Sequence, residues 1–310
     1  MTTALITHPA CLEHDTGPYH PETSERLRAV LGALEAPEFA PLLRESAPMA
    51  TVEQLSRVHP REYVEAILAI HPEEGEPIQL DGDTVMSHGS AEAAARAAGA
   101  ACMAVDAVQE GWARAAFAAV RPPGHHAEPN RPMGFCLFNN VAVAAMHART
   151  RWGIQRIAVV DFDVHHGNGT QAMFADDADL FYASSHQSPC YPGTGESWEH
   201  GVADNIVNTP LRPRDGSAAF RSAWSNVILP ALDRFAPGLL IISAGFDAHI
   251  ADPLAQLRLE TTDFAWITDE LVAVADKHCG GRIVSVLEGG YDLTALAASA
   301  AVHVRGLMRA

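Results

Sequence analysis

Short apolar runs alternate with longer helical patterns along this chain. The runs are bounded by turn residues, as buried parallel strands are, and cover residues 4–7, 116–120, 157–160, 180–183, 239–243 and 283–287. Patterns with helical spacing, several of them rich in alanine, cover residues 90–110, 141–149, 217–235, 262–278 and 293–307. No fixed-period repeat is present. The alternation predicts a parallel β-sheet with helices on both faces.

Polar stretches that contain glycine follow four of the predicted strands. They read RPPGHHAE from Arg121, DFDVHHGNG from Asp161, SAGFDAH from Ser243 and EGGYD from Glu288. In open α/β sheets the ligand crevice lies outside the carboxyl ends of the strands. Because these stretches also carry most of the clustered His and Asp residues, we expect the four loops to converge on one site.

Composition limits the class of protein. The chain has 310 residues, 48% hydrophobic and 19% charged, which predicts a single domain over residues 1–310. No apolar run approaches the ~20 residues of a membrane span, and the amino terminus lacks the layout of a signal peptide, so we expect a cytoplasmic protein. The formal charge is −17. An acidic field repels phosphate backbones, so we expect no direct nucleic-acid or membrane partner.

The side chains available as metal ligands are carboxylates and imidazoles. The five cysteines are scattered and form no CxxC pair, which argues against a disulfide framework or a thiolate zinc cage. In an extended strand end, residues two apart point the same way, so Asp161, Asp163 and His165 share one face. Two carboxylates side by side repel unless a cation lies between them. Asp163 and His165, with Asp247 as the best candidate for a third ligand, form a candidate Zn²⁺ site.

Two further loops supply groups for proton transfer. His125 and His126 follow a proline pair and a glycine. A histidine of near-neutral pKa can take a proton from metal-bound water, so one of the two is expected to be a general base, and Asp161 behind His125 would fix its tautomer. Tyr291 follows two glycines, and its phenol can hydrogen-bond a developing oxyanion.

Taken in order, these motifs resemble the histone deacetylase family, most closely its class II and bacterial deacetylase-like amidohydrolase branches. The motifs are RPPGHHAE, GFCLFNN, VDFDVHHGNG, YPGTGE, SAGFDAH and EGGYD, and the resemblance runs from about His14 to Tyr291. It implies an arginase/deacetylase-like α/β fold with three α/β/α layers and a central, mostly parallel sheet of eight strands. It also implies deacetylation of lysine or related amines with one catalytic zinc, and assigns the zinc ligands and catalytic residues to the positions named above.

The resemblance implies further site residues. A structural potassium ion in the family is bound at positions that match Asp161, Asp163, His165, Ser184 and Ser185. The acyl-lysine channel is lined at positions that match Gly134, Phe135, Tyr191 and Leu254. Arg26 matches an arginine near the acetate-exit channel.

Three positions distinguish branches of the family. Asn168 stands where class I members have aspartate behind the second histidine, which leaves the proton assignment between His125 and His126 open. Tyr291 stands where a weakly active branch has histidine, so we expect catalysis. Leu254 stands where a polyamine-preferring branch has a glutamate, which argues against that preference.

We therefore predict a zinc-dependent amidohydrolase that removes acetyl or related acyl groups from lysine side chains or similar primary amines. The alternative on the same fold is an acetylpolyamine or other small-amide hydrolase, which the charge of −17 would suit. An arginase-type ureohydrolase would need a two-manganese cluster with more carboxylates than one DxDxH motif. A binding module that grips acylated tails without turnover is disfavoured by the intact Tyr291 and histidine pair. The sequence leaves the physiological substrate and the oligomeric state open.

Overall fold

A computed structural model describes residues 2–310, and its centre is an eight-stranded sheet in which all adjacent strands run parallel. The strand order is β2-β1-β5-β10-β9-β6-β7-β8. The strands are β1 (Thr3–Thr7), β2 (Leu43–Ser46), β5 (Ala115–Ala118), β6 (Ile157–Asp161), β7 (Leu180–Gln187), β8 (Ile206–Leu211), β9 (Leu239–Ala244) and β10 (Ile283–Leu287). The predicted parallel sheet is confirmed.

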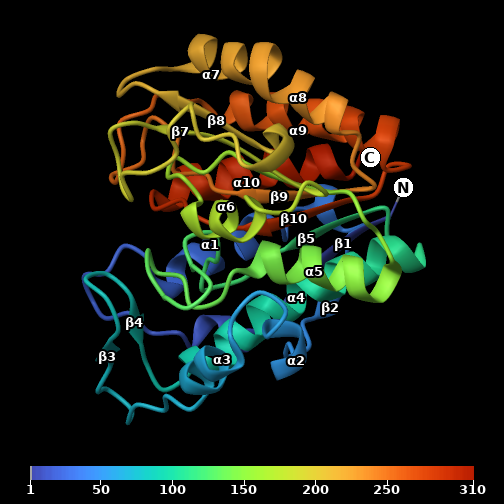
Figure 1. The fold of residues 1–310 in the computed structure, drawn as a ribbon. Helices are drawn as coiled ribbons and strands as arrows, with labels where there is room; N and C mark the ends of the chain where they lie inside the picture. The colour runs from blue at the N-terminus through green and yellow to red at the C-terminus, as the bar shows by residue number, and fades with distance from the viewer. Residues whose placement is uncertain (1) are drawn as a thin grey trace.

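Helices cover both faces of this sheet. Figure 1 shows α7, α8 and α9 on one side and α4 and α5 on the other. The helices are α1 (Ser24–Ala33), α2 (Val52–Leu55), α3 (Arg61–Leu68), α4 (Ser90–Glu110), α5 (Asn140–Trp152), α6 (Asn168–Phe174), α7 (Ser217–Ala223), α8 (Leu229–Phe235), α9 (Thr261–His278) and α10 (Leu293–Leu307). Single turns of other helical types are η1 (Pro9–Leu12), η2 (Pro37–Phe39), η3 (Val202–Asp204) and the π-helical η4 (Trp224–Ile228).

The two edge strands were missed by the apolar pattern. Every residue of β2 is exposed, so this strand has no apolar run to detect. β8 contains Pro210, which lacks a backbone N–H and is tolerated in a sheet mainly at its edge. The sequence signal for a parallel strand is double-sided burial, and an edge strand lacks it.

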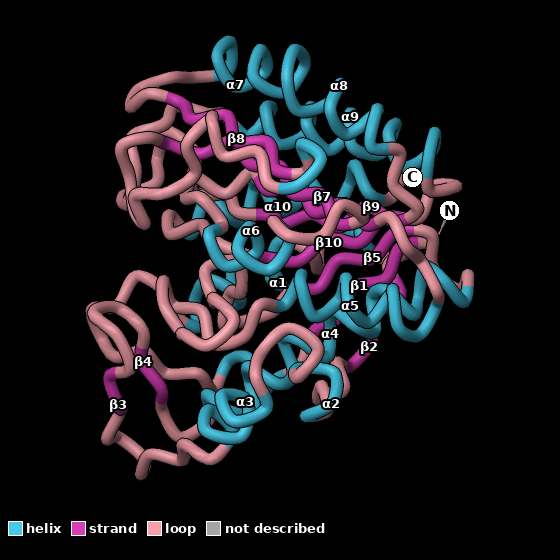
Figure 2. The backbone as a smooth tube through the Cα atoms, viewed as in Figure 1, coloured by secondary structure: helices cyan, strands magenta, loops and turns pink. Residues whose placement is uncertain are grey.

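The predicted helix 217–235 is divided in the structure. α7 passes through η4 into α8, and Pro230 lies in the first turn of α8. A proline removes one backbone donor from the helical ladder, which accounts for the wider π turn just before it. α1 was not predicted because its buried face includes the charged Arg26. Figure 2 also shows the antiparallel hairpin of β3 (Ile78–Gln79) and β4 (Val85–Met86), which lies apart from the main sheet.

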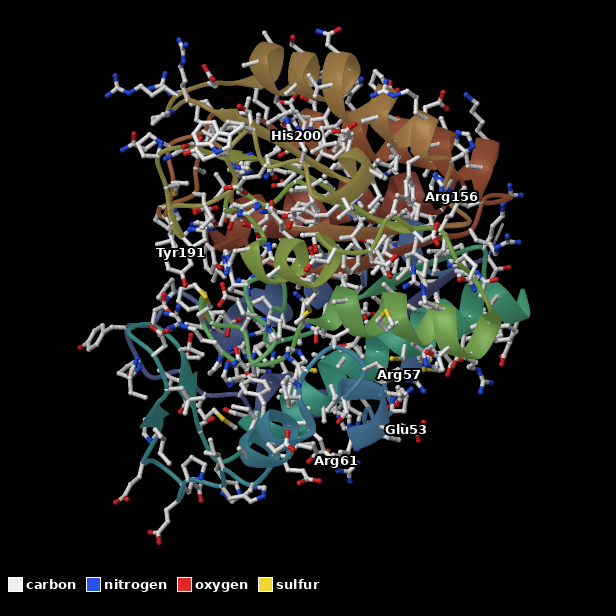
Figure 3. All side chains as sticks on the ribbon, viewed as in Figure 1. Glu53, Arg57, Arg61, Arg156, Tyr191 and His200 are labelled. Carbon is white, nitrogen blue, oxygen red and sulfur yellow. The ribbon has the colours of Figure 1, made fainter. Side chains whose placement is uncertain are left out.

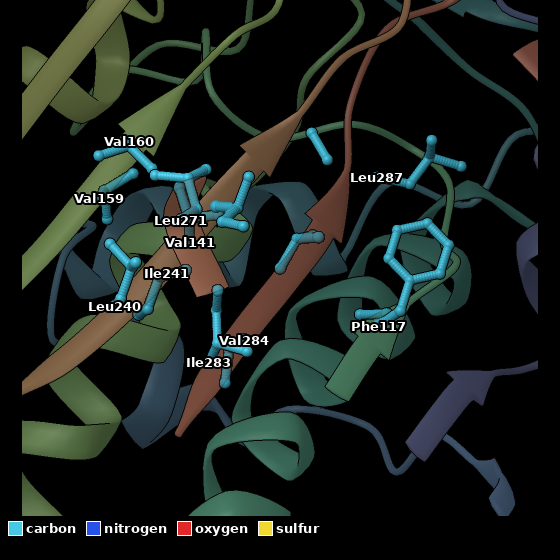
Figure 4. Packing of buried hydrophobic residues seen from close by; sticks show 14 of the residues in the cluster. Phe117, Val141, Val159, Val160, Leu240, Ile241, Leu271, Ile283, Val284 and Leu287 are labelled. Atoms are coloured by element: carbon cyan, nitrogen blue, oxygen red, sulfur yellow. The ribbon is translucent and has the colours of Figure 1, made fainter. Parts of the chain in front are cut away.

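The core lies between the sheet and its helices. β9 and β10 pair in register, with Ile283 opposite Leu240 and Val284 opposite Ile241, and Figure 4 shows these side chains packed side by side. All four are fully buried. Such continuous apolar strands are typical of sheets covered on both faces. The central strands therefore form a rigid platform for the loops at their ends.

Helix caps fix where two of these loops stop. The side chain of Asn139 accepts a hydrogen bond from Ala142 N at 3.0 Å and begins α5. Asp292 does the same for Ala295 N at 2.8 Å, so α10 begins directly after Tyr291. All five cysteines are free thiols. Within residues 2–310 no helix has both the length and the apolarity needed to cross a membrane.

Candidate functional site

The carboxyl ends of four neighbouring strands meet at one edge of the sheet. β5, β10, β9 and β6 are adjacent in the strand order, and these are the strands that the four polar loops follow. Figure 2 shows loops gathered at the left-hand end of the molecule, and Tyr191, labelled in Figure 3, lies at that end. The expected convergence of the four loops is therefore confirmed.

Three residues that the sequence suggests as metal ligands lie together at this edge. Candidate ligand atoms of Asp163, His165 and Asp247 all lie within 4.8 Å of one another. Nδ1 of His165 is 3.2 Å from Oδ1 of Asp163 and 3.2 Å from Oδ2 of Asp247. All three side chains are buried. In the part of the chain that the structure describes, this is the one group of three or more His, Cys, Asp or Glu residues with metal-binding geometry.

The backbone orients both carboxylates. Oδ2 of Asp163 accepts a hydrogen bond from Gly289 N at 2.8 Å, and Oδ1 of Asp163 accepts one from His165 N at 2.9 Å. Oδ1 of Asp247 accepts one from Val164 N at 2.9 Å. Hydrogen bonds of this kind hold ligand side chains in place before a metal arrives. These hydrogen bonds therefore connect the loop after β6 to the loops after β9 and β10.

The donor set fits a divalent cation. Oδ2 of Asp247 is buried and accepts no hydrogen bond from any residue between 2 and 310. Such an atom is costly unless a cation or proton satisfies it. Burial raises the pKa of Asp247 to about 7, and the charge of Asp163 acts in the same direction. Two carboxylates and one imidazole are a ligand set that Zn²⁺ accepts, and a bound cation would allow both carboxylates to stay ionised.

Two glycines leave room for the carboxylates. A Cβ atom on Gly289 would lie 2.1 Å from Oδ2 of Asp247, and one on Gly245 would lie 2.0 Å from Oδ2 of Asp163. Neither contact is sterically possible, so any other residue at these positions would displace a ligand. This explains why the loops after β9 and β10 contain glycine directly beside the metal-ligand candidates.

His125 is paired with a buried carboxylate. Its Nδ1 lies 2.9 Å from Oδ2 of Asp161, and the same oxygen accepts a hydrogen bond from the Tyr182 hydroxyl at 3.1 Å. Burial acts to lower the pKa of His125, but the charges of Asp163, Asp161 and Glu288 outweigh it and raise the pKa to about 10. The contact between Asp161 and His125 that the sequence suggested is therefore present, and it favours a protonated imidazole.

His126 has a neutral partner instead. Its Nδ1 lies 2.8 Å from the amide oxygen of Asn168, whose amide nitrogen donates to Oε1 of Glu128 at 2.9 Å. Because the amide nitrogen faces the carboxylate, the amide oxygen faces His126, so Nδ1 carries the proton and Nε2 is left as an acceptor. Burial and the neighbouring His125 and His165 lower the pKa of His126 well below its usual value. His125 therefore favours the protonated form, whereas His126 favours the neutral form.

Tyr291 lies on the loop that follows β10. Its backbone N–H donates to Oδ2 of Asp252 at 2.8 Å, and its ring packs edge-on against Phe135 with 5.9 Å between centroids. The guanidinium of Arg26 lies 4.8 Å from the ring centroid. Burial raises the pKa of the Tyr291 phenol well above its usual value, so the hydroxyl keeps its proton and can donate it in a hydrogen bond.

A cavity of about 210 Å³ opens onto these groups. It is lined by Asp83, His126, Gly134, Phe135, His165, Tyr191, Leu254 and Tyr291. All four channel residues suggested by the family resemblance are in this set. Tyr191 packs edge-on against His126 with 5.1 Å between centroids, so the aromatic wall continues down to the histidine pair. The cavity is narrow, mostly apolar at its sides and polar at its inner end.

Asp83 also lines this cavity, and His20 contacts Asp83 and Phe135; the sequence singled out neither Asp83 nor His20. Oδ1 of Asp83 accepts a hydrogen bond from Gly134 N at 3.1 Å. His20 lies 3.0 Å from the backbone oxygen of Asp83 and packs edge-on against Phe135, with 4.7 Å between centroids. Each contact joins segments more than fifty residues apart in the chain, and neither residue stands in a strand-end motif that would have marked it.

A cluster of buried charges lies behind Tyr291, and only its Arg26 was predicted. Nε of Arg26 donates to the backbone oxygen of Gly290 at 2.5 Å, and its NH1 group donates to Glu22 at 2.8 Å. Arg121 donates to both carboxylate oxygens of Glu22, at 2.6 Å and 2.7 Å. Burial opposes ionisation of Glu22, but Arg121 and Arg26 outweigh it and lower its pKa to about 2. Arg26 therefore connects this buried cluster to the backbone directly before Tyr291.

The residues suggested for potassium lie on two neighbouring strands. Asp161 at the end of β6 is the register partner of Ser184 on β7. The Ser184 hydroxyl lies 2.9 Å from Nδ1 of His186, and the Ser185 hydroxyl accepts a hydrogen bond from Trp224 at 2.9 Å. Both hydroxyls already have protein partners. His88, to which the sequence assigned no role, lies 3.1 Å from the backbone oxygen of Pro72 and does not line the cavity.

Known proteins are similar to this chain in both sequence and architecture. The family model for the histone deacetylase domain matches residues 20–307. A histone deacetylase-like amidohydrolase of Pseudomonas aeruginosa is 39% identical over 315 residues, which cover 94% of this chain and 82% of that protein. The polyamine deacetylase HDAC10 of Homo sapiens is 38% identical over 326 residues, which cover 99% of this chain and 48% of that protein.

A solved structure has the same architecture as this chain. The crystal structure of the HDA15 HD domain superposes with a TM-score of 0.92 at 34% identity, and the match covers 99% of this chain and 90% of that chain. The arginase/deacetylase-like fold that the motifs implied is therefore confirmed, with a sheet that is parallel throughout rather than mostly parallel. Since both the family model and close relatives cover almost its whole length, this chain belongs to the histone deacetylase family.

Proposed function

We propose that this chain is a zinc-dependent amidohydrolase that removes acetyl or related acyl groups from lysine side chains or similar primary amines. One observation carries the proposal. Oδ2 of Asp247 is buried, accepts no hydrogen bond from residues 2–310 and lies 3.2 Å from Nδ1 of His165, which lines the same cavity as His126 and Tyr291. A metal-ligand set, a proton acceptor and a phenol at the end of one narrow cavity are what amide hydrolysis by activated water requires.

Asp163, His165 and Asp247 would hold the zinc ion. When bound there, zinc would polarise the scissile carbonyl and lower the pKa of a water molecule. The single three-residue group among residues 2–310 supports one catalytic ion rather than the two-manganese cluster of an arginase. The backbone hydrogen bonds from Gly289 and Val164 keep both carboxylates aimed at the same point.

His126 is assigned as the general base. Its Nδ1 proton is directed to Asn168, so Nε2 is free to take a proton from the attacking water. His125, held by Asp161, keeps its proton and supports the charge that develops beside it. The protonated hydroxyl of Tyr291 donates a hydrogen bond to the carbonyl oxygen as negative charge grows there. The amine then leaves with a proton returned from the histidine pair.

The walls of the cavity suit an aliphatic linker. Phe135 and Tyr191 line it with aromatic rings, and the partly exposed Leu254 adds an aliphatic surface. Each CH₂ group of a lysine side chain buried there contributes about 0.8 kcal/mol. This supports an acylated lysine or a similarly slender amine as substrate.

Two further roles suggested by the family belong to the same proposal. Asp161, Asp163, His165, Ser184 and Ser185 would bind a structural potassium ion through oxygens at the ends of β6 and β7. Arg26, which donates to the Gly290 oxygen beneath Tyr291, would act where acetate leaves.

The test is an activity panel with metal control. Acetyl-lysine peptides and longer acyl-lysine peptides would be offered to the purified chain as isolated, after chelation, and after zinc is restored. We expect hydrolysis that is lost with the metal and regained with zinc. Equal rates with and without metal would refute the proposal.

A polyamine substrate is the second candidate. The formal charge of −17 and the carboxylate of Asp83 in the cavity wall favour a polycationic substrate. Leu254 argues against it, because the mouth lacks a carboxylate at that position. Turnover of acetylputrescine and acetylspermidine, measured beside the peptides, separates the two candidates. Inert peptides with active polyamines would replace the first candidate by the second.

A further inference from the structure

Glu288 is a fully buried carboxylate whose one effect described so far is that its charge helps to raise the pKa of His125. It lies at the end of β10, directly before the two glycines and Tyr291. Asp161, Asp163 and Asp247 are also buried at the same edge of the sheet. Each of those contacts a histidine. A fourth carboxylate so close to them is electrostatically costly, so its retention calls for a specific set of partners.

The partners of Glu288 are backbone groups of the histidine loop. Oε2 of Glu288 accepts hydrogen bonds from Gly124 N at 2.7 Å and from His125 N at 3.2 Å. Oε1 accepts one from the Ser243 hydroxyl on β9 at 3.2 Å. Hydrogen bonds from backbone N–H groups to a carboxylate are short and strong, and two on one oxygen define a direction as well as a distance. The side chain therefore links β10 to the loop that carries both histidines.

The backbone of Glu288 is held as firmly as its side chain. Its N–H donates to the Ala244 oxygen at 3.0 Å, and its carbonyl oxygen accepts a hydrogen bond from Arg26. The next residue, Gly289, donates to Oδ2 of Asp163 at 2.8 Å. One short segment thus contacts the histidine loop on one side and a metal-ligand candidate on the other, and leads directly into Tyr291.

We propose that Glu288 is a positioning residue that sets the spacing between the His125–His126 loop and the segment carrying Tyr291. This inference rests on the proposed function, because the spacing matters only if these groups act together. Misplacing a catalytic group by about 1 Å costs on the order of 10²-fold in rate. A loop that begins with Pro122, Pro123 and Gly124 has few side chains that could hold it, so an acceptor from the neighbouring strand supplies the constraint.

The test separates reach from charge. E288Q keeps an oxygen at the same distance and removes the charge, whereas E288D keeps the charge and withdraws it by one methylene. We expect E288Q, which also removes one of the charges that raise the pKa of His125, to lose less than about 10-fold in kcat, and E288D to lose about 10²-fold with KM changed less than about 3-fold. Zinc content should stay at one ion per chain in both variants. E38D, a shortened carboxylate on the surface beside Arg305, is the matched control and should match the wild type.

A second readout does not depend on activity. Hydrogen–deuterium exchange of peptides covering residues 117–127 should speed up in E288D and stay as in the wild type in E288Q, because only E288D releases the two amides. Unchanged exchange and unchanged kcat in E288D would overturn the inference. A loss of kcat in E288Q as large as in E288D would overturn it too, since charge and not reach would then matter. A wild-type chain without hydrolytic activity would refute the proposed function, while the exchange result would still decide the contact.

Discussion

Nδ1 of His126 lies 2.8 Å from the amide oxygen of Asn168, whereas the adjacent His125 faces the carboxylate of Asp161. The neighbouring imidazoles therefore have a neutral and a charged partner. Under the proposed function this asymmetry makes His126 the base and His125 the protonated partner, and it leads to a prediction about pH.

Replacing Asn168 by Asp should raise the pKa of His126. A carboxylate within hydrogen-bond distance stabilises the protonated imidazole, typically by at least ~1 pH unit. The acidic limb of kcat/KM, where the base becomes protonated, should move upward by about that amount. Profiles measured between about pH 5 and pH 9 check this. Glu128→Gln, which changes the other partner of Asn168, is the control and should shift the limb much less. An unmoved acidic limb in N168D would remove His126 from the role of base.

Replacing Asp247 by Asn should abolish tight zinc binding. Loss of a residue that only hydrogen-bonds to a zinc ligand costs ~10 to 100-fold in zinc affinity, and loss of a ligand itself should cost more than that. Zinc content per chain and a competition titration with a chelator measure the effect directly. Asp269→Asn, an exposed carboxylate paired with Arg309, should leave both quantities unchanged. Full zinc content and affinity in D247N would place the metal elsewhere.

Replacing Tyr291 by Phe should lower kcat by about 10² to 10³-fold, the cost of removing one donor from an oxyanion site. Affinity for an acylated peptide should change little, since the ring and its contact with Phe135 remain. Steady-state kinetics and equilibrium binding are needed together. Tyr63→Phe removes a buried hydroxyl that donates to the Leu137 oxygen, away from the cavity, and serves as the control. If Y291F hydrolyses its best substrate at the wild-type rate, the phenol has no catalytic role, and a binding module regains support.

Replacing Leu254 by Glu should shift preference toward acetylpolyamines. Leu254 is 38% exposed at the edge of the cavity, so a carboxylate there can meet a protonated secondary amine without being buried. We expect the ratio of kcat/KM for acetylspermidine to that for an acetyl-lysine peptide to rise by about 10-fold, equivalent to ~1.4 kcal/mol. In the control L254Q, glutamine has nearly the same shape as glutamate but no charge, so the ratio should stay near the wild-type value. Equal ratios in both variants would show that shape, not charge, selects the substrate at this position.

Replacing Glu22 by Gln should destabilise the fold at neutral pH. The pKa of Glu22 is lowered from 4.5 to about 2 by Arg121 and Arg26 against the effect of burial. A lowered pKa gives stability that is present above pH 4.5 and is lost as the pH falls toward 2, here about 3 kcal/mol.

Urea unfolding at pH 7 and near pH 3 measures this effect. The difference in free energy of unfolding between wild type and E22Q should be large at pH 7 and smaller near pH 3, because at pH 3 Glu22 of the unfolded chain is already protonated, which offsets part of the stability from its ionised folded form. Glu38→Gln at the exposed pair with Arg305 should change stability little at either pH. A difference that stays constant with pH would mean that Glu22 is not ionised in the folded chain.

Much of the fold was predictable because the central strands have a simple physical signature. β5, β6, β7, β9 and β10 are buried on both faces, so their residues form apolar runs that stand out in the sequence. The edge strands β2 and β8 lack this signature, because solvent on one side removes the need for apolar residues. Their places in the sheet are decided by pairing with β1 and β7.

The site, like the fold, was predictable only in part. The sequence by itself determined that Asp163, His165, Asp247, the histidine pair and Tyr291 stand at strand ends, and parallel strands bring such ends to one edge of a sheet. Only the tertiary structure decided which neighbours these groups have. Asn168 behind His126, Glu22 beneath Arg26, Asp83 in the cavity wall and Glu288 under the histidine loop are contacts made across folded segments. Periodicity reports which residues face the core, whereas a polar contact depends on where two loops meet in space, and that is set by packing of the whole chain.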